Sequence, residues 1–270
     1  MNTPAVRMQT LGAVAVLTID RPDSLNALDL AALRELRAHL VEFRDRAELR
    51  AAVLTGEGNR AFCAGADLKG TQHSAASYAQ ALFQGTEQSA DLGLYIRLMD
   101  LGELGLCKPI VAAVNGHCLG AGLEMALQCD LRIASSTASF GLPEARVGSI
   151  PAVSGLHRLL KAVPSAHAMQ MALAGERIDA AKAQQIGLVS DVIEPAALMD
   201  RALELARAIA ANAPLAVQAI KRLSRQTQHL SEADAQQLTE LYWGVLRDTD
   251  DRIEGRQAFA QKRAPVYAGR

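Results

Sequence analysis

Aromatic residues are scarce in this sequence, at 4% of its 270 residues, and neither sign of charge is in excess, with 28 Lys and Arg against 29 Asp and Glu. A chain with a formal net charge of −1 has no global field that would attract nucleic acid or an anionic membrane. Few aromatic side chains also leave few platforms on which bases could stack. We therefore expect neither nucleic acid nor a membrane among the partners of this protein.

The sequence also lacks long apolar runs and paired cysteines. No run approaches the ~18 residues of a membrane span, and no basic segment followed by an apolar stretch opens the chain. The cysteines lie in apolar surroundings without Cys-x-x-Cys spacing, at Cys63, Cys107, Cys118 and Cys129. This pattern favours buried free thiols in a reducing compartment over a disulfide framework or a zinc site. We expect a cytoplasmic protein without a bound metal.

Three common motifs of nucleotide binding and catalysis are missing as well. The chain contains no G-x-G-x-x-G, no G-x-x-x-x-G-K-[ST] and no G-x-S-x-G. The glycine-rich segment 116–122 follows a predicted strand, but its spacing differs and it lies in mid-chain. The sequence thus disfavours a dinucleotide-binding protein, a phosphate-loop NTPase and a serine hydrolase. The remaining composition is that of one large globular domain, or one domain with an appendage.

The chemistry that is present gathers in residues 108–151. An apolar, β-branched run at 110–114 predicts a buried strand, and a helical pattern follows three small residues at 120–122. Backbone N–H groups at such a strand-to-helix junction have no intrahelical partners, so they can point at an anion or a developing oxyanion. Glu124 lies in the first turn of the predicted helix, and Glu144 lies 20 residues later. The stretch therefore offers oxyanion donors and two candidate acid/base carboxylates.

The rest of the chain predicts an α/β core followed by a helical region. Apolar runs at 13–19 and 51–55 predict strands, and an amphipathic helix is predicted between them. The order of strand, helix, strand and glycine-rich loop then recurs near residue 110. Beyond residue 151 the pattern is mostly helical, and no Pro- or Gly-rich linker interrupts it. We place the boundary between a catalytic core of residues 1–195 and a C-terminal helical region of residues 196–270.

Two segments resemble the enoyl-CoA hydratase/isomerase, or crotonase, superfamily. The family pattern A-V-N-G-x-x-x-G-G-G-x-E-L-x-x-x-C-D corresponds to residues 113–130, and its F-x-x-P-E segment to residues 140–144. A second family segment, A-F-x-A-G-A-D-L, stands at residues 61–68. The resemblance implies an α/β fold, a crotonase-like spiral of repeated ββα units. It also implies C-terminal helices that assemble subunits into a homotrimer or a dimer of trimers.

The resemblance assigns roles to individual residues. It implies that Glu124 holds and deprotonates a water molecule and that Glu144 protonates the α-carbon of the substrate. It places an oxyanion hole at the backbone N–H groups of Ala66 and Ala121, the latter where many relatives have glycine. A further backbone N–H, that of Ala152, would help to hold the water.

Binding of coenzyme A is likewise implied by the resemblance. Backbone near Cys63 and Ala64 would hold the adenine, and Lys69 and Lys262 are the candidates for the phosphates. Coenzyme A would be part of the acyl-CoA substrate, so no separate cofactor is implied. The divergent region 70–107 would line and cover the acyl pocket, either as a mobile lid or as a plain surface helix.

The sequence therefore predicts a hydro-lyase of fatty acid metabolism that adds water reversibly across the 2,3 double bond of an enoyl-CoA thioester. The first glutamate favours a hydratase over an enoyl-CoA isomerase, which commonly keeps only the second. A hydroxyacyl-CoA dehydratase and a hydratase for branched or carboxylated enoyl-CoAs remain open. A non-catalytic RNA-binding protein on the same scaffold is a further alternative, against which both carboxylates and the near-neutral charge argue.

Overall fold

A six-stranded sheet forms the centre of the part of the chain that the computed structural model describes, residues 4–67 and 78–270. The strand order is β1-β2-β3-β5-β7-β10. The first two strands form an antiparallel hairpin, and the neighbours from β2 onward are parallel. The bounds are β1 Val6–Leu11, β2 Val14–Ile19, β3 Ala51–Gly56, β5 Ile110–Val114, β7 Leu131–Ser135 and β10 Asp191–Ile193.

A smaller sheet stands beside the larger one. In the described residues it has the order β4-β6-β8-β9, with bounds β4 Ala61–Cys63, β6 His117–Leu119, β8 Ser139–Gly141 and β9 Arg177–Asp179. The chain passes from the larger sheet to the smaller one at β3 to β4, at β5 to β6 and at β7 to β8. The unit of β5, β6 and α5 (Ala121–Ala126) is one complete ββα turn. The predicted spiral of ββα units is confirmed.

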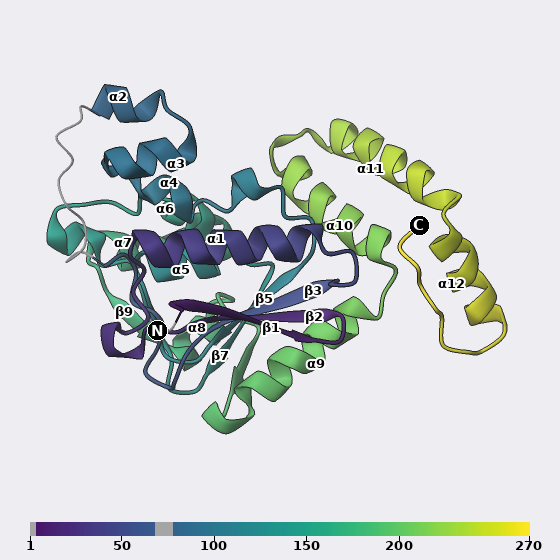
Figure 1. The fold of residues 1–270 in the computed structure, drawn as a ribbon, viewed down its shortest axis with the longest axis horizontal. Helices are drawn as coiled ribbons and strands as arrows, with labels where there is room; N and C mark the ends of the chain where they lie inside the picture. The colour runs from purple at the N-terminus through teal and green to yellow at the C-terminus, as the bar shows by residue number, and fades with distance from the viewer. Residues whose placement is uncertain (1–3, 68–77) are drawn as a thin grey trace.

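Helices cover both faces of the larger sheet (Figure 1). On one face α1 (Leu30–Asp45) buries Leu33, Leu36, Leu40 and Phe43, and its Asp29 N-cap accepts a hydrogen bond from the N–H of Ala32. On the other face α9 (Leu198–Ala210) packs alanines against β3 and β5. Because both faces are covered, every residue of β3 and β5 is buried.

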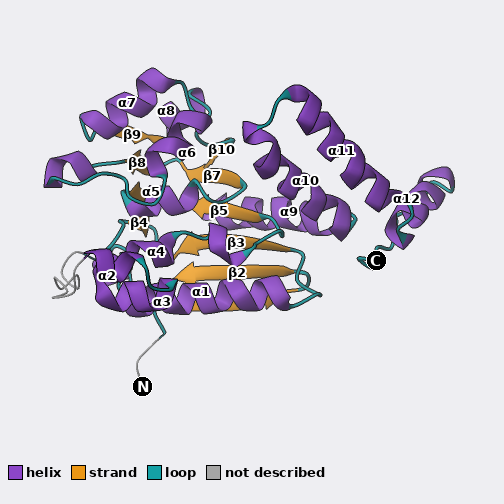
Figure 2. Cartoon of the chain, turned by 90° about the horizontal axis from the view of Figure 1, so that it is seen from above, coloured by secondary structure: helices purple, strands orange, loops and turns teal. Residues whose placement is uncertain are grey.

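The remaining helices fall into two groups. One group surrounds the smaller sheet and the region between residues 78 and 104: α2 Tyr78–Leu82, α3 Thr86–Ser89, α4 Ile96–Met99, α6 Gly155–Ala162, α7 Ser165–Leu173 and α8 Ala180–Gln185. The other group follows α9: α10 Pro214–Gln226, α11 Glu232–Arg247 and α12 Asp250–Ala260. The second group reaches away from the sheets, with α12 farthest out (Figures 1 and 2).

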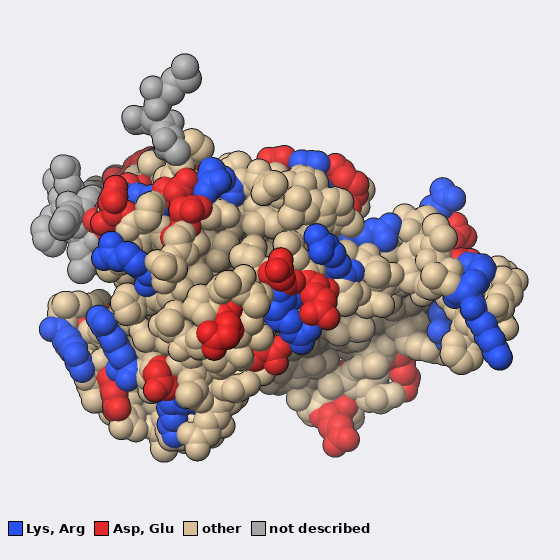
Figure 3. All heavy atoms as spheres, turned by 90° about the horizontal axis from the view of Figure 1, so that it is seen from below, with Lys and Arg blue, Asp and Glu red and all other residues tan. Residues whose placement is uncertain are grey.

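The surface carries charge of both signs. Figure 3 shows acidic and basic side chains interspersed over one face rather than gathered by sign. In the described residues no helix is long and apolar enough to cross a membrane.

Several local features differ from the sequence-based prediction. Strand β1 and the strands of the smaller sheet were not predicted from the sequence. The strands of the smaller sheet have three residues each, too few to show a period of two. The final strand, β10, begins at Asp191, and Leu188 and Val189 just before it are buried. Of the four free cysteines only Cys107 is not buried.

Candidate active site

The first turn of α5 packs directly on the backbone of the segment that follows β4. A Cβ atom at Gly122 would lie 2.0 Å from the carbonyl oxygen of Cys63, so this contact admits only glycine. Nearby, a Cβ atom at Gly65 would lie 3.3 Å from the amide nitrogen of Ala121. These close approaches bring the two predicted oxyanion donors, Ala66 and Ala121, onto neighbouring segments although 55 residues separate them.

In the hydrogen-bond pattern of both segments, the N–H groups of Ala66 and Ala121 donate to no acceptor among the described residues. Leu28 forms a parallel β-bridge with Ala66. In this bridge the Leu28 N–H donates to the Gly65 carbonyl and the Asp67 N–H donates to the Leu28 carbonyl, each at 2.9 Å. Because amides alternate in direction along extended chain, the Ala66 N–H points away from this pairing. The Ala121 N–H begins α5 and has no intrahelical acceptor. Within the described residues neither amide donates a hydrogen bond.

The carboxylate of Glu124 is held at the start of α6. Its side chain projects from α5, and the residue is 2% exposed. Its Oε1 atom accepts hydrogen bonds from the N–H groups of Val153 (2.8 Å) and Gly155 (2.9 Å). Burial raises the pKa of Glu124, while these two hydrogen bonds and the charge of Arg158 oppose that rise. The donors thus fix the carboxylate in place and favour its ionised form.

The carboxyl group of Glu144 lies against the other side of the junction. Glu144 follows β8, and its Oε1 would be 3.1 Å from a Cβ atom at Gly120, the residue that precedes α5 with φ 54°. Its Oε2 atom is buried without a hydrogen-bond partner. Burial, assisted by the negative charge of Glu124, raises the pKa of Glu144 to about 7. Near neutral pH this group therefore exists in both protonation states.

The arrangement offers two carboxyl groups of unequal proton affinity beside two undonated amides. One carboxyl group is hydrogen-bonded and favours ionisation, and the other is desolvated and retains its proton more readily. Such a pair can accept a proton at one point and deliver a proton at another. The amides can stabilise negative charge on an oxygen placed between them.

Comparison with known proteins finds relatives that match this chain over almost its whole length. A profile of the family described as enoyl-CoA hydratase/isomerase matches residues 9–270. The (E)-benzylidenesuccinyl-CoA hydratase of Thauera aromatica is 41% identical over 264 residues, covering 98% of this chain and 99% of that protein. The carnitinyl-CoA dehydratase of Proteus mirabilis is 38% identical over 272 residues, with coverage of 98% and 99%. An enoyl-CoA hydratase structure from Bacillus anthracis superposes with a TM-score of 0.88 at 33% identity, covering 98% of this chain and 100% of that one.

The chain belongs to the enoyl-CoA hydratase/isomerase family. The family resemblance read from the residues is thereby confirmed.

Of the other predicted site residues, the structure places some near the start of α5 and others away from it. Cys63 and Ala64 adjoin the start of α5, with the Ala64 N–H donated to the Leu25 carbonyl at 3.0 Å. Lys69 lies outside the described residues. Lys262 follows α12, which stands at the opposite end of the molecule from α5 (Figure 1). Within one chain, the fold therefore does not bring Lys262 to the glutamate pair.

Two features of the site were not anticipated from the sequence. The first is that the amides of Val153 and Gly155 donate to Glu124; Ala152, the predicted donor to the water, is exposed beside them. The available signal was the start of a helix after residue 154, because the first N–H groups of a helix have no acceptor within it. The second feature is Arg21, whose Nη2 contacts Asp67 (3.2 Å) and Asp29 (2.8 Å) and so ties the Ala66 segment to the chain before α1.

Proposed function

We propose that this chain is a hydro-lyase that adds water reversibly across the 2,3 double bond of an enoyl-CoA thioester. One observation carries the proposal. A hydrogen-bonded carboxylate, Glu124, and a desolvated carboxyl group, Glu144, flank a junction at which the amides of Ala66 and Ala121 are undonated. Hydration of a conjugated thioester needs one base, one acid and one oxyanion site, and these groups supply all three.

In the hydration direction Glu124 acts as the base. It takes a proton from water as the water oxygen forms a bond to the β-carbon of the substrate. The electron pair of the double bond moves toward the thioester carbonyl, whose oxygen becomes negatively charged. Donation by the amides of Ala66 and Ala121 stabilises that oxygen, and one such donor is worth ~2.7–4 kcal/mol in other enzymes.

Glu144 acts as the acid. It transfers its proton to the α-carbon of the enolate, and the carbonyl double bond re-forms. Its pKa of about 7 keeps a substantial fraction protonated at neutral pH. Glu124 is then protonated and Glu144 ionised, and exchange with solvent restores the starting state. The reverse sequence eliminates water.

The relatives support a reaction that runs in either direction. Among them is a hydratase of (E)-benzylidenesuccinyl-CoA, and others are dehydratases of carnitinyl-CoA. Their names favour the transfer of water on a CoA thioester over isomerisation of a double bond. We therefore place hydroxyacyl-CoA dehydration as the second candidate, with the same residues in reversed roles.

The test follows the absorbance of the conjugated thioester when purified protein meets enoyl-CoAs of several chain lengths. We expect rapid loss in the wild type and turnover at least ~10²-fold lower in Glu124→Gln and Glu144→Gln, with coenzyme A binding retained. Glu194→Gln, exposed directly after β10, is the matched control. Wild-type turnover in either active-site variant would overturn the two-carboxylate assignment.

The proposal includes the assembly and the coenzyme A contacts. Large apolar side chains are exposed on the outermost helices, among them Trp243 (59% exposed) and Phe259 (87% exposed). Exposed apolar surface of this kind marks an interaction site, so we assign it to contact between subunits of a homotrimer or a dimer of trimers. In such an assembly Lys262 would serve the active site of a neighbouring subunit, while Cys63 and Ala64 would hold the adenine through their own backbone.

A further inference from the structure

The turn between β2 and α1, residues 21–28, lies against the segment that carries the Ala66 amide. Two of its residues have left-handed backbone although neither is glycine, Leu25 with φ 52° and Asn26 with φ 55°. Apart from Ser154 before α6 and one residue near the C-terminus, no other described non-glycine residue has φ in this region. Such a conformation costs free energy and persists only where surrounding contacts hold it.

The side chain of Asn26 supplies three of these contacts. Asn26 is 1% exposed, and its Oδ1 accepts a hydrogen bond from the N–H of Arg21 at 3.0 Å. Its Nδ2 donates to the carbonyls of Ala61 (2.6 Å) and Glu57 (3.0 Å). Ala61 begins β4 and Glu57 follows β3. The turn is therefore bound to the two strands that precede the Ala66 segment.

The backbone of the turn takes up the amides on either side of Ala66. The Leu25 carbonyl accepts a hydrogen bond from the N–H of Ala64 at 3.0 Å. The Leu28 carbonyl accepts one from the N–H of Asp67 at 2.9 Å. Between them, the Ala66 N–H donates to no acceptor among the described residues. The position of the turn therefore sets the direction in which the predicted oxyanion donor points.

Arg21 joins the turn, α1 and the Ala66 segment through a single guanidinium group. Its Nη1 donates to the Ala27 carbonyl, and its Nη2 lies 2.8 Å from Oδ2 of Asp29 and 3.2 Å from Oδ2 of Asp67. Asp29 is the N-cap of α1, and Asp67 directly follows Ala66. The side chain of Arg21 is 20% exposed. One side chain thus couples the predicted donor to the end of a helix that packs on the core.

The magnitude of these contacts indicates a role in rate more than in stability. Ion pairs that remain partly exposed contribute little to the free energy of unfolding. The planar fork of a guanidinium does, however, fix several acceptors in one geometry, which the point charge of a lysine does not. A misplacement of ~1 Å in a catalytic site can cost ~10²-fold in rate. Holding the Ala66 segment in place is therefore the larger effect of Arg21.

We propose that Arg21 is a positioning residue for the oxyanion hole. Through Asp67 and the Ala27 carbonyl it holds the Ala66 N–H where the thioester oxygen becomes negatively charged. This inference rests on the proposed hydro-lyase activity and adds to it a residue that acts through the Ala66 segment rather than on the reacting atoms. Loss of Arg21 should weaken the stabilisation of the enolate more than the binding of the thioester, because the donated hydrogen bond matters most when the oxygen is charged.

The first readout is the infrared stretching frequency of a bound thioester carbonyl. Hexanoyl-CoA, isotope-labelled at its carbonyl carbon, has no double bond to hydrate, so its complex with the enzyme is stable. Hydrogen bonds from fixed donors polarise a carbonyl group and lower this frequency. We expect the wild type to lower the frequency below its value in water, and Arg21→Gln to reverse a large part of that shift.

The second readout is the hydration of trans-hexenoyl-CoA, followed by absorbance. We expect Arg21→Gln to lower kcat at least ~10-fold and to change KM by no more than about threefold, as for an interaction made chiefly in the transition state. Arg21→Lys keeps a positive charge beside Asp29 and Asp67 but lacks the planar fork. We therefore expect it to restore part of the rate and part of the frequency shift.

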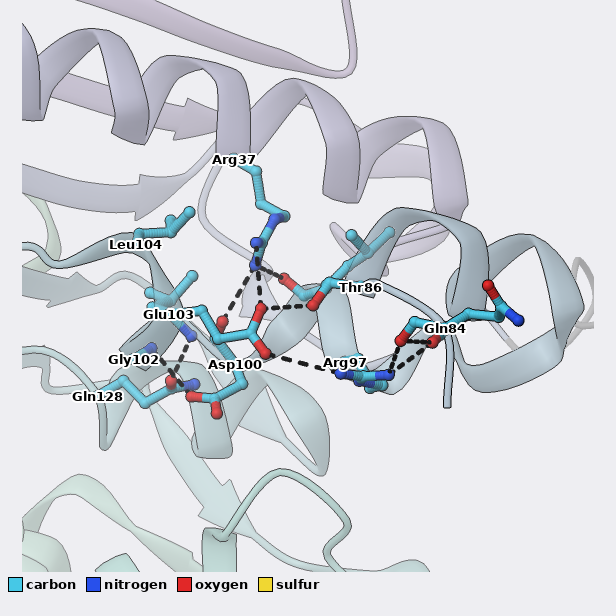
Figure 4. Close-up of polar contacts among 12 residues, drawn as sticks. Arg37, Gln84, Thr86, Arg97, Asp100, Gly102, Glu103, Leu104 and Gln128 are labelled. Carbon is cyan, nitrogen blue, oxygen red and sulfur yellow. Dashed lines mark hydrogen bonds and ion pairs between the residues drawn. The ribbon is translucent and has the colours of Figure 1, made fainter. Parts of the chain in front are cut away.

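Arg37→Gln is the matched control. Arg37 is an arginine of α1 whose side chain is 12% exposed and donates to the carbonyls of Leu98 and Asp100, each at 3.0 Å. Figure 4 shows Arg37 reaching from α1 to the segment that contains Asp100 and Glu103. None of these contacts involves residues 63–67. We expect this variant to lose stability while the carbonyl frequency of bound hexanoyl-CoA stays at its wild-type value.

The outcomes separate this inference from the proposed function. An unchanged frequency in folded Arg21→Gln, beside a lowered frequency in the wild type, would overturn this inference alone. If Arg21→Gln does not fold, Asp67→Asn carries the same comparison, because it removes the charge of the ion pair with little change in side-chain volume. An equal frequency in water and in the wild-type complex would overturn the oxyanion assignment. Hydration of no enoyl-CoA would overturn the proposed function, and either result would remove this inference with it.

Discussion

A methyl group added at Gly155 should disable the candidate active site without changing any acid or base in it. In the native structure the Gly155 amide donates to Oε1 of Glu124 at 2.9 Å. A Cβ atom at Gly155 would lie 2.5 Å from both Cγ and Oε1 of Glu124. The three nearest atoms all belong to that one side chain. We therefore expect Gly155→Ala to displace the Glu124 carboxylate.

The size of the displacement follows from the contact distances. Ordinary van der Waals contact begins at 3.4 Å, so the Glu124 side chain must retreat by about 0.9 Å from the position it now holds. That shift stretches the hydrogen bonds from Val153 and Gly155. A misplacement of ~1 Å in a reacting group can cost ~10²-fold in rate. Overpacking of a buried site typically also costs ~1–3 kcal/mol of stability.

The assay measures kcat on an enoyl-CoA together with the free energy of unfolding by denaturant. Gly244→Ala is the matched control, because Gly244 is also helical and has open space where its Cβ would stand. We expect the control to keep full turnover and to gain up to ~1 kcal/mol of stability from better helix propensity. Turnover within about threefold of wild type in folded Gly155→Ala, well short of the ~10²-fold expected for such a shift, would refute the placement of Glu124 as the water-activating base.

Two further expectations concern pH and assembly. Because burial raises the pKa of Glu144 from 4.5 to about 7, the folded state keeps a proton that the unfolded chain releases, so the free energy of unfolding should fall as pH rises across that interval. The full shift corresponds to ~3 kcal/mol, which partial exposure reduces to about 1–2 kcal/mol. Glu144→Gln should lose this part of the dependence of the unfolding free energy on pH, as measured by denaturation curves at several pH values. The same pH dependence in the variant and the wild type would contradict the raised pKa of Glu144. Separately, the mass in solution should be that of three or six chains, and a stable monomer would exclude the assignment of the exposed α11 and α12 side chains to subunit contacts.

The sequence by itself determined the elements whose pattern is local and long. The helix that buries Leu33, Leu36, Leu40 and Phe43 was readable because 3.6-residue periodicity over four turns places apolar side chains on one stripe. The buried strand at 110–114 was readable because both faces are covered, which makes the run continuously apolar. The glutamate pair was found through the motif around residues 113–144 rather than through periodicity.

Tertiary structure alone decided which groups meet at the site. The amides of Val153 and Gly155 carry no side-chain signature, and only the packing of α6 against α5 brings them to Glu124. The raised pKa of Glu144 likewise depends on burial beside Gly120, a contact between residues 24 positions apart in the chain.

The same limit applies to Lys262, which follows α12. Local sequence sets helices and strands because backbone preferences and burial patterns act over a few residues. The burial of Glu144, the amides without an acceptor and the position of Lys262 depend on distances through space. Those distances exist only once the chain has folded.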